Sequence, residues 1–183
     1  MKSFLHRIFG KGRSVDATPD AMAEQAPEHV PEHVDVRETG WPLVPDRFHL
    51  LHVGRTTQGN GYWITPQLAT EDGATRDFIA AYVFAPDGAL ISCDVVDLGL
   101  RSGGSDRVVD TTISRLKTKI DAETVEEIRV KPFSRMFYGH CFGLVIREPD
   151  AGDDDPSHET LIDALPGHTL MFQGPWTSCN YDS

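Results

Sequence analysis

The stretch from Arg76 to Ile120 constrains the fold most, because two strand-like runs and a helix follow one another in it. Residues 78–84 place apolar side chains on both faces of an extended chain, since successive side chains of a strand point to opposite sides. Residues 90–98 have a second extended pattern, and Pro86-Asp87-Gly88 between the two runs is typical of a turn. The sequence therefore predicts a β-hairpin.

A helix is predicted over residues 105–120, directly after the hairpin. Its apolar side chains recur at i, i+4, i+7 and i+11, on one side of the helix: Val109, Ile113, Leu116 and Ile120. Ser105 is the expected N-cap, with acidic residues near the start and basic residues near the end, as the helix dipole favours. A helix with one apolar face needs a surface to cover, and the preceding hairpin is the nearest one.

Shorter patterns extend the prediction through the rest of the chain. Strands are expected at residues 48–53, 62–65, 125–133, 135–147, 160–165 and 168–172, with a loop at 67–75. Residues 135–147 are apolar on both faces near their middle and predict one central strand covered on both sides. Trp176 and Tyr181 indicate that the C-terminal tail is docked, because free ends are usually small and polar.

The 183 residues allow one domain with a core and some tail, and the predicted organisation has three parts. Residues 1–13 form a basic amphipathic segment, residues 14–40 a disordered linker rich in acids and proline, and residues 41–183 a single globular α+β domain. In that domain we expect a mostly antiparallel sheet of about six to eight strands, covered by one main helix at about 105–120.

The N-terminal segment, residues 1–13, holds four of the 17 basic residues of the chain and no acid. Its apolar residues fall at helical spacing, so it could form a short amphipathic helix on an anionic membrane or in the groove of a partner. The alternative is a frayed terminus without a role, since so short a helix is marginal in water. The residues expected to make a membrane or partner contact are Phe4, Leu5, Arg7, Ile8 and Phe9.

Small and large residues alternate within residues 135–147, and the small ones are Gly139, Cys141 and Gly143. A stripe of small side chains lets another element approach a sheet closely. Two interpretations remain open: the helix packs there, or a ligand or partner segment binds there. The second makes these three residues a candidate ligand-binding site, with His52, His140 or His168 near its rim.

Motifs for cofactors and metals are not found in the sequence, so we expect neither. Gly99 to Ser105 lacks the lysine and the glycine spacing of phosphate-binding loops. The near-repeat over residues 28–35 brings two histidines together, but Pro31 interrupts any shared helical face, which favours a low-complexity stretch over a metal site.

Asp94 and Asp97 interrupt an apolar strand, and their spacing places them on opposite faces. A paired general acid and base is therefore not expected from them. Solvent exposure of both side chains is the favoured interpretation. The alternative is that one of the two marks an edge or a polar pocket, paired with Arg101 or Arg135.

Charge and cysteine content limit the class of partner and the compartment. With 28 acidic against 17 basic residues the net charge is −11, which disfavours nucleic-acid binding. The three cysteines are odd in number and widely spaced, as in proteins of reducing compartments. The sequence shows no secretory signal and no apolar run of roughly 18 residues, so we expect a cytoplasmic protein, membrane-peripheral if residues 1–13 bind a membrane.

Two functional hypotheses follow from these observations. The first is a non-catalytic cytoplasmic binding protein, of adaptor or immunity type, whose acidic surface binds a protein partner with a basic surface. The alternative is an enzyme or small-ligand-binding module with a pocket near Cys141. The first is favoured because no catalytic set is assembled in the sequence.

Overall fold

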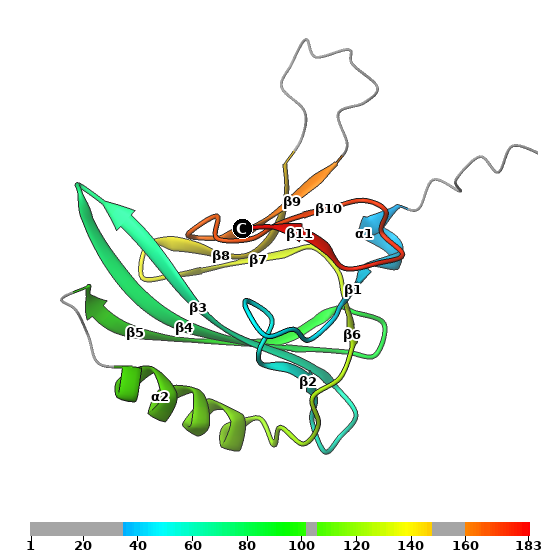
Figure 1. Cartoon of the computed structure of the whole chain (residues 1–183), viewed down its shortest axis with the longest axis horizontal. Helices are drawn as coiled ribbons and strands as arrows, with labels where there is room; N and C mark the ends of the chain where they lie inside the picture. The colour runs from blue at the N-terminus through cyan, green and yellow to red at the C-terminus, as the bar shows by residue number, and fades with distance from the viewer. Residues whose placement is uncertain (1–34, 102–105, 148–159) are drawn as a thin grey trace, which may run out of the picture. The chain divides into compact units, whose positions relative to one another are not determined.

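Two antiparallel sheets pack face to face in the computed structural model, which describes residues 35–101, 106–147 and 160–183, and a helix covers the outer face of one sheet (Figure 1). The first sheet has the order β2-β3-β4-β5, formed by Val53–Arg55, Gly61–Glu71, Ala74–Phe84 and Leu90–Leu100. The second has the order β11-β10-β9-β8-β7, formed by Asn180–Asp182, Met171–Gln173, Leu161–Leu165, His140–Arg147 and Phe133–Phe137. A two-stranded sheet pairs β1 (Trp41–Leu43) with β6 (Ile128–Val130).

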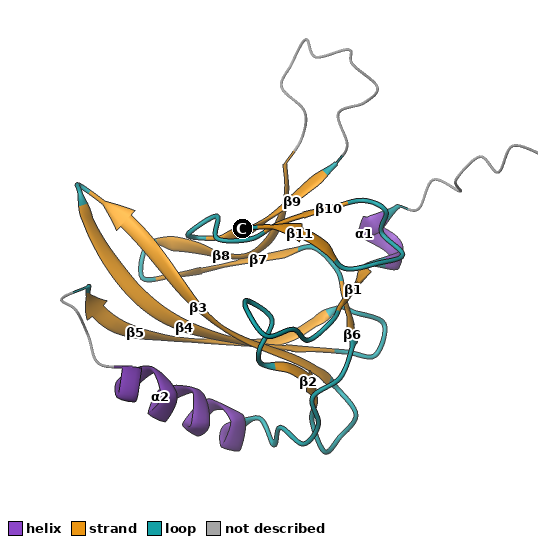
Figure 2. Ribbon diagram, in the orientation of Figure 1, coloured by secondary structure: helices purple, strands orange, loops and turns teal. Residues whose placement is uncertain are grey.

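The α+β class predicted from the sequence is confirmed, with 51% strand in three sheets and one main helix, α2 (Asp106–Lys119) (Figure 2). The sequence predicted one sheet of about six to eight strands, whereas the structure has no single sheet of that size among the described residues. The strands divide between two large sheets, because strand β4 is apolar on both faces and each face needs its own cover.

The two faces of β4 explain the layered arrangement. Phe78 and Tyr82 point into the core between the sheets, where Phe78 lies 5.2 Å from Phe142 of β8, measured between ring centroids. Ile79 and Ala81 point the other way and pack against Ile113 and Leu116 of α2, together with Tyr62 and Ile64 of β3. The predicted helix and the surface that it covers are therefore confirmed.

The hairpin between β3 and β4 is longer than the sequence indicated, because residues 67–75 are not a loop. The strands pair from Gly61 with Phe84 to Glu71 with Ala74, and Asp72-Gly73 makes the turn. Both turn residues have positive φ, 50° at Asp72 and 78° at Gly73, which is the geometry of the tightest hairpin turns. The Asp-Gly pair was the sequence signal for this turn.

Residues 135–147 are also a hairpin and not one central strand. β7 and β8 pair antiparallel around Tyr138-Gly139, whose φ angles are 51° and 81°. A positive φ is uncommon for tyrosine, so Tyr138 does not indicate a turn at this position from the sequence alone. The expected strand at 125–133 shortens to β6, and the expected pair of strands around Pro166-Gly167 is present as β9 and β10.

The stretch expected to be a strand at 48–53 is mostly a turn. Oδ1 of Asp46 accepts hydrogen bonds of 2.8 to 2.9 Å from the main-chain N–H groups of Phe48, His49 and Leu50. Those donors are therefore satisfied by a side chain and not by a neighbouring strand, and only Val53 enters β2.

The described fold already includes residues before Trp41, the predicted start of the domain. Asp35 caps the short helix α1 (Val36–Thr39) by accepting from Arg37 N–H at 2.9 Å, and Val36 is buried in the core. At the other end the docked tail is confirmed, since β11 pairs with β10 and the Trp176 ring lies 5.8 Å from that of Trp41. The remaining residues of the expected linker, 14–34, lie outside the described part.

Candidate functional site

The outer edge of β5 is the longest open edge of the two large sheets. The other edge strands are short: β2 and β11 have three residues each and β7 has five, whereas β5 has 11. Along the whole of its length β5 pairs with β4 alone among the described strands. Exposed edges are usually short or covered, because their unpaired N–H and C=O groups can pair with another chain.

One hydrogen bond shows which main-chain groups of β5 point outward. The Val95 carbonyl accepts from the Tyr138 hydroxyl of the β7–β8 turn at 3.4 Å, so it points away from β4. In an antiparallel pair the outward groups belong to every second residue, and the register is regular from Cys93 to Val95. Cys93 therefore presents its N–H and C=O to the same side.

The charges that could protect this edge are already neutralised. Asp97 accepts from Arg76 of β4 at 2.6 Å, and Asp94 accepts from Lys119 at 2.7 Å. The alternative that paired one of these carboxylates with Arg101 or Arg135 is wrong, because Asp97 pairs with Arg76, Asp94 with Lys119, and Arg101 with Asp77. The spacing of Asp94 and Asp97 predicted that they lie on opposite faces. It could not predict the cross-strand ion pair of Asp97 with Arg76, because that pair depends on the register of β4 and β5.

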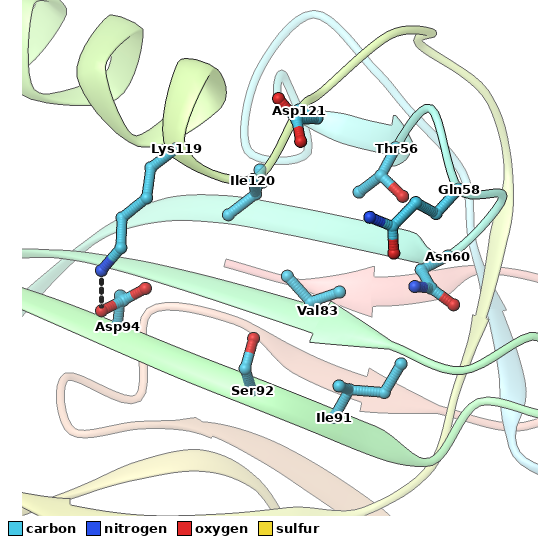
Figure 3. Close-up of a pocket in the computed structure, with 10 residues that line it drawn as sticks. All are labelled: Thr56, Gln58, Asn60, Val83, Ile91, Ser92, Asp94, Lys119, Ile120 and Asp121. Atoms are coloured by element: carbon cyan, nitrogen blue, oxygen red, sulfur yellow. Dashed lines mark hydrogen bonds and ion pairs between the residues drawn. The ribbon is translucent and has the colours of Figure 1, made fainter.

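A pocket of about 290 Å³ lies over β4 and the edge strand β5, on the side of the sheet that faces α2 (Figure 3). The turn after β2 supplies Thr56, Gln58 and Asn60, and the chain after α2 supplies Ile120 and Asp121. β4 and β5 supply the rest of the lining: Val83, Ile91, Ser92 and Asp94, with Lys119 of α2 above Asp94. Small-molecule sites span roughly 300–1,000 Å³, so this pocket fits a single side chain or a small polar group.

Main-chain hydrogen bonds fix the wall of the pocket that is farthest from β5. Thr57 N–H donates to the Asp121 carbonyl at 2.9 Å, and Thr56 pairs with Ala122 in an isolated bridge. The Thr56 hydroxyl is buried and has no hydrogen-bond partner among the described residues. Asp121 has a φ of 53°, a conformation in which aspartate and asparagine are enriched.

The electrostatics of the pocket favour a cation. Lys119 is paired with Asp94, while the carboxylate of Asp121 has no ion pair within residues 35–101, 106–147 and 160–183. The C-terminal end of α2, which carries the negative end of the helix dipole, lies at the same place. Two carboxylates, one ammonium and a helix C-terminus give this pocket a negative balance.

The residues of the predicted ligand site do not line this pocket. Gly139 occupies the turn between β7 and β8, and a Cβ at Gly143 would overlap the carbonyl oxygen of Phe133 in the neighbouring strand. Gly143 is therefore explained by close approach within the sheet. Cys141 is half-buried. One interpretation expected α2 to pack over it, but the helix covers the other sheet.

The histidines expected at the rim are dispersed. His140 is half-buried with its ring against Phe78, at 5.7 Å between centroids, and His168 lies 3.5 Å from the buried Asp163. Desolvation, followed by the positive charge of Lys117, lowers the pKa of His52. None of the three lines the pocket beside β5.

The thiols of Cys93 and Cys179 are poor nucleophiles at neutral pH. Burial, with a further contribution from Asp94, raises the pKa of Cys93 to about 12, and burial also raises the pKa of Cys179. Within the described ranges no three His, Cys, Asp or Glu side chains gather as a metal site would require. None of the helices in the described part combines the length and the apolar character that a membrane span requires.

Two predictions from the N-terminal sequence lie outside the described residues. These are the membrane or partner contact by Phe4, Leu5, Arg7, Ile8 and Phe9, and the histidine near-repeat, of which only Asp35 is described. Both stay predictions.

Comparison of the chain with protein-family models, with curated proteins and with solved structures finds no match.

Proposed function

We propose that this chain is a non-catalytic protein-binding module that takes up an extended segment of a basic partner protein as an additional strand along β5. Strand addition of this kind obtains affinity from main-chain hydrogen bonds and specificity from the pockets beside the edge. The observation that carries the proposal is the 11-residue edge strand, which is paired on one side only among the described strands.

The accessibility of the edge supports the proposal. Ile91 and Leu100, near its two ends, are 55% and 59% exposed although both are large and apolar. The middle is partly covered, because Tyr138 reaches Val95 and β7 comes close to β5. The stretch from Ile91 to Cys93 is therefore the part of the edge that a partner strand would reach first.

The charge of the chain supports a basic partner. A net charge of −11 raises the association rate of cationic partners and disfavours anionic ones. An adaptor or an immunity protein is a concrete form of such a module, and a cytoplasmic site of action fits the free cysteines.

The test is a selection of random nine-residue peptides displayed on phage, with the full chain as bait and the Val95→Pro variant as the counter-bait. The Val95 N–H points outward, so proline removes an edge donor without breaking a bond to β4. Val95→Ile keeps the N–H and serves as the matched control. Thermal unfolding of both variants establishes that they are folded.

We expect enrichment of peptides rich in β-branched residues on the wild-type chain and on Val95→Ile, and their loss on Val95→Pro. Synthetic copies with N-methyl groups at alternate residues should lose binding, because they cannot donate to the edge. This second measurement stands even if the proline variant unfolds. The proposal is wrong if no sequence is enriched, or if N-methylated and unmodified peptides bind alike.

A further inference from the structure

We infer that the pocket beside β5 receives a lysine or arginine side chain from the segment that adds to this strand. The inference rests on the proposed function, and it names the chemistry that the partner segment must carry. The pocket shares the residues Ile91, Ser92 and Asp94 with the edge strand itself.

The register places the pocket on the correct side of an added strand. Ser92 pairs with Val83 and Asp94 with Ala81, which belongs to the face of the sheet that packs under α2. A strand added beside β5, at a spacing of about 4.8 Å, would direct every second side chain to this same face. A long side chain on that face would extend across Ser92 and Asp94, which line the pocket.

The walls of the pocket match a long basic side chain from stem to tip. Val83, Ile91 and Ile120 offer apolar surface for the methylene groups, which basic residues commonly bury while their charge stays hydrated. The Asp121 carboxylate and the side-chain oxygens of Gln58 and Asn60 are acceptors for the N–H groups at the tip.

An acidic or neutral guest is disfavoured by the same geometry. An anion would lie beside Asp94, Asp121 and the C-terminal end of α2. Among the described lining residues Lys119 is the one cation, and it is already paired with Asp94. A neutral guest would leave the Asp121 carboxylate without an ionic partner.

The experiment uses four synthetic nine-residue peptides of alternating threonine and valine that differ at the central position, which is arginine, lysine, glutamine or glutamate. Binding to the full chain is measured by fluorescence anisotropy at low salt. Asp121→Asn removes one charge and keeps a residue that tolerates the φ of 53° at this position. Asp106→Asn, at the opposite end of α2, is the matched control for loss of one acidic charge.

We expect the arginine and lysine peptides to bind about fivefold more tightly than the glutamine peptide, as for one partly exposed ion pair, and the glutamate peptide to bind weakest. Asp121→Asn should remove this preference, and Asp106→Asn should leave it unchanged. If all four peptides bind equally and N-methylation still abolishes binding, the pocket inference is wrong while strand addition stands. If no peptide binds, or if N-methylation has no effect, strand addition itself is wrong and the inference falls with it.

Discussion

Lys119, the last residue of α2, forms an ion pair with Asp94 of the edge strand β5, with Nζ 2.7 Å from Oδ1. Both side chains are more than one-third exposed, so the pair contributes little to stability. The pair instead holds the end of the helix close to the open edge, and its two side chains form one wall of the pocket.

The C-terminal tail is held by a hydrogen bond from the Tyr181 hydroxyl to the Asp46 carboxylate. Desolvation alone would raise the pKa of Asp46, but this bond and the three main-chain donors lower it from 3.8. A carboxyl group with a lowered pKa stabilises the fold above its unfolded pKa, and this contribution is lost as the pH falls through the folded value. We expect Tyr181→Phe to lower the free energy of unfolding by about 1–2 kcal/mol at pH 7.

Urea denaturation at pH 7 and at about pH 3 checks this prediction, because the difference between variant and wild type should shrink at the lower pH. Tyr138→Phe is the matched control: it removes a phenol hydroxyl whose hydrogen bond is 3.4 Å long and exposed. An equal loss in both variants, or a loss independent of pH, would contradict the assignment.

Gly143 and Gly139 should respond differently to alanine. Both have positive φ, 151° and 81°, so both variants carry a backbone penalty. Only at Gly143 does the added Cβ meet main-chain atoms, those of Phe133 and Ser134, whereas at Gly139 no atom of the described residues lies within 4 Å. We expect Gly143→Ala to cost about 2 kcal/mol more than Gly139→Ala in urea denaturation, since overpacking typically costs 1–3 kcal/mol. Equal costs would show that the strand pair can relax there.

Gln67 is a polar residue of the core between the sheets, 2% exposed, and neither atom of its amide has a partner among the described residues. An unsatisfied buried polar group costs roughly 1–3 kcal/mol. Gln67→Met, which keeps the length of the side chain, should therefore raise the free energy of unfolding by about 1 kcal/mol. Thr65→Val on the same strand is the comparison, because the Thr65 hydroxyl donates to Pro66 at 3.0 Å and its loss should not stabilise the fold. A lower stability of Gln67→Met would indicate that the amide is satisfied.

The basic amphipathic segment, residues 1–13, remains a prediction with a direct assay. If Phe4, Leu5, Ile8 and Phe9 insert into an anionic surface, the full chain should float with phosphatidylserine vesicles and a chain without residues 1–13 should not. Reversing Lys2 and Arg7 to glutamate is the matched variant that keeps the apolar residues. Equal flotation of all three chains would show that this segment has no membrane role.

The sequence predicted the elements whose signals are local. The stripe of Ile113 and Leu116 defined α2, and Pro86-Asp87-Gly88 defined the β4–β5 hairpin, because helix periodicity and turn chemistry act over a few residues. The turn at Asp72-Gly73 carried an equally local signal and was missed because the surrounding polar residues resemble a loop. In the turn at Tyr138-Gly139, only the glycine is a residue that indicates a turn.

The candidate site could not be predicted in the same way. The pocket joins residues 56–60, 91–94 and 119–121, which are distant along the chain and meet only through strand order and register. The ligand prediction was based on the small residues Gly139, Cys141 and Gly143. The absence of a side chain at Gly143 is explained instead by the carbonyl oxygen of Phe133, which a Cβ there would overlap. The open edge of β5 also depends on strand order, which hydrophobic alternation does not encode.

The central claim is that β5 accepts a partner strand, and amide-resolved hydrogen exchange by NMR tests it most directly. The full chain is measured alone and saturated with the arginine-containing peptide. We expect the outward amides of Cys93 and Val95 to exchange at least about tenfold more slowly in the complex, while amides of α2 and β8 keep their rates. Unchanged exchange at Cys93 and Val95 in the saturated complex, or protection confined to β7 or β11, would contradict the account.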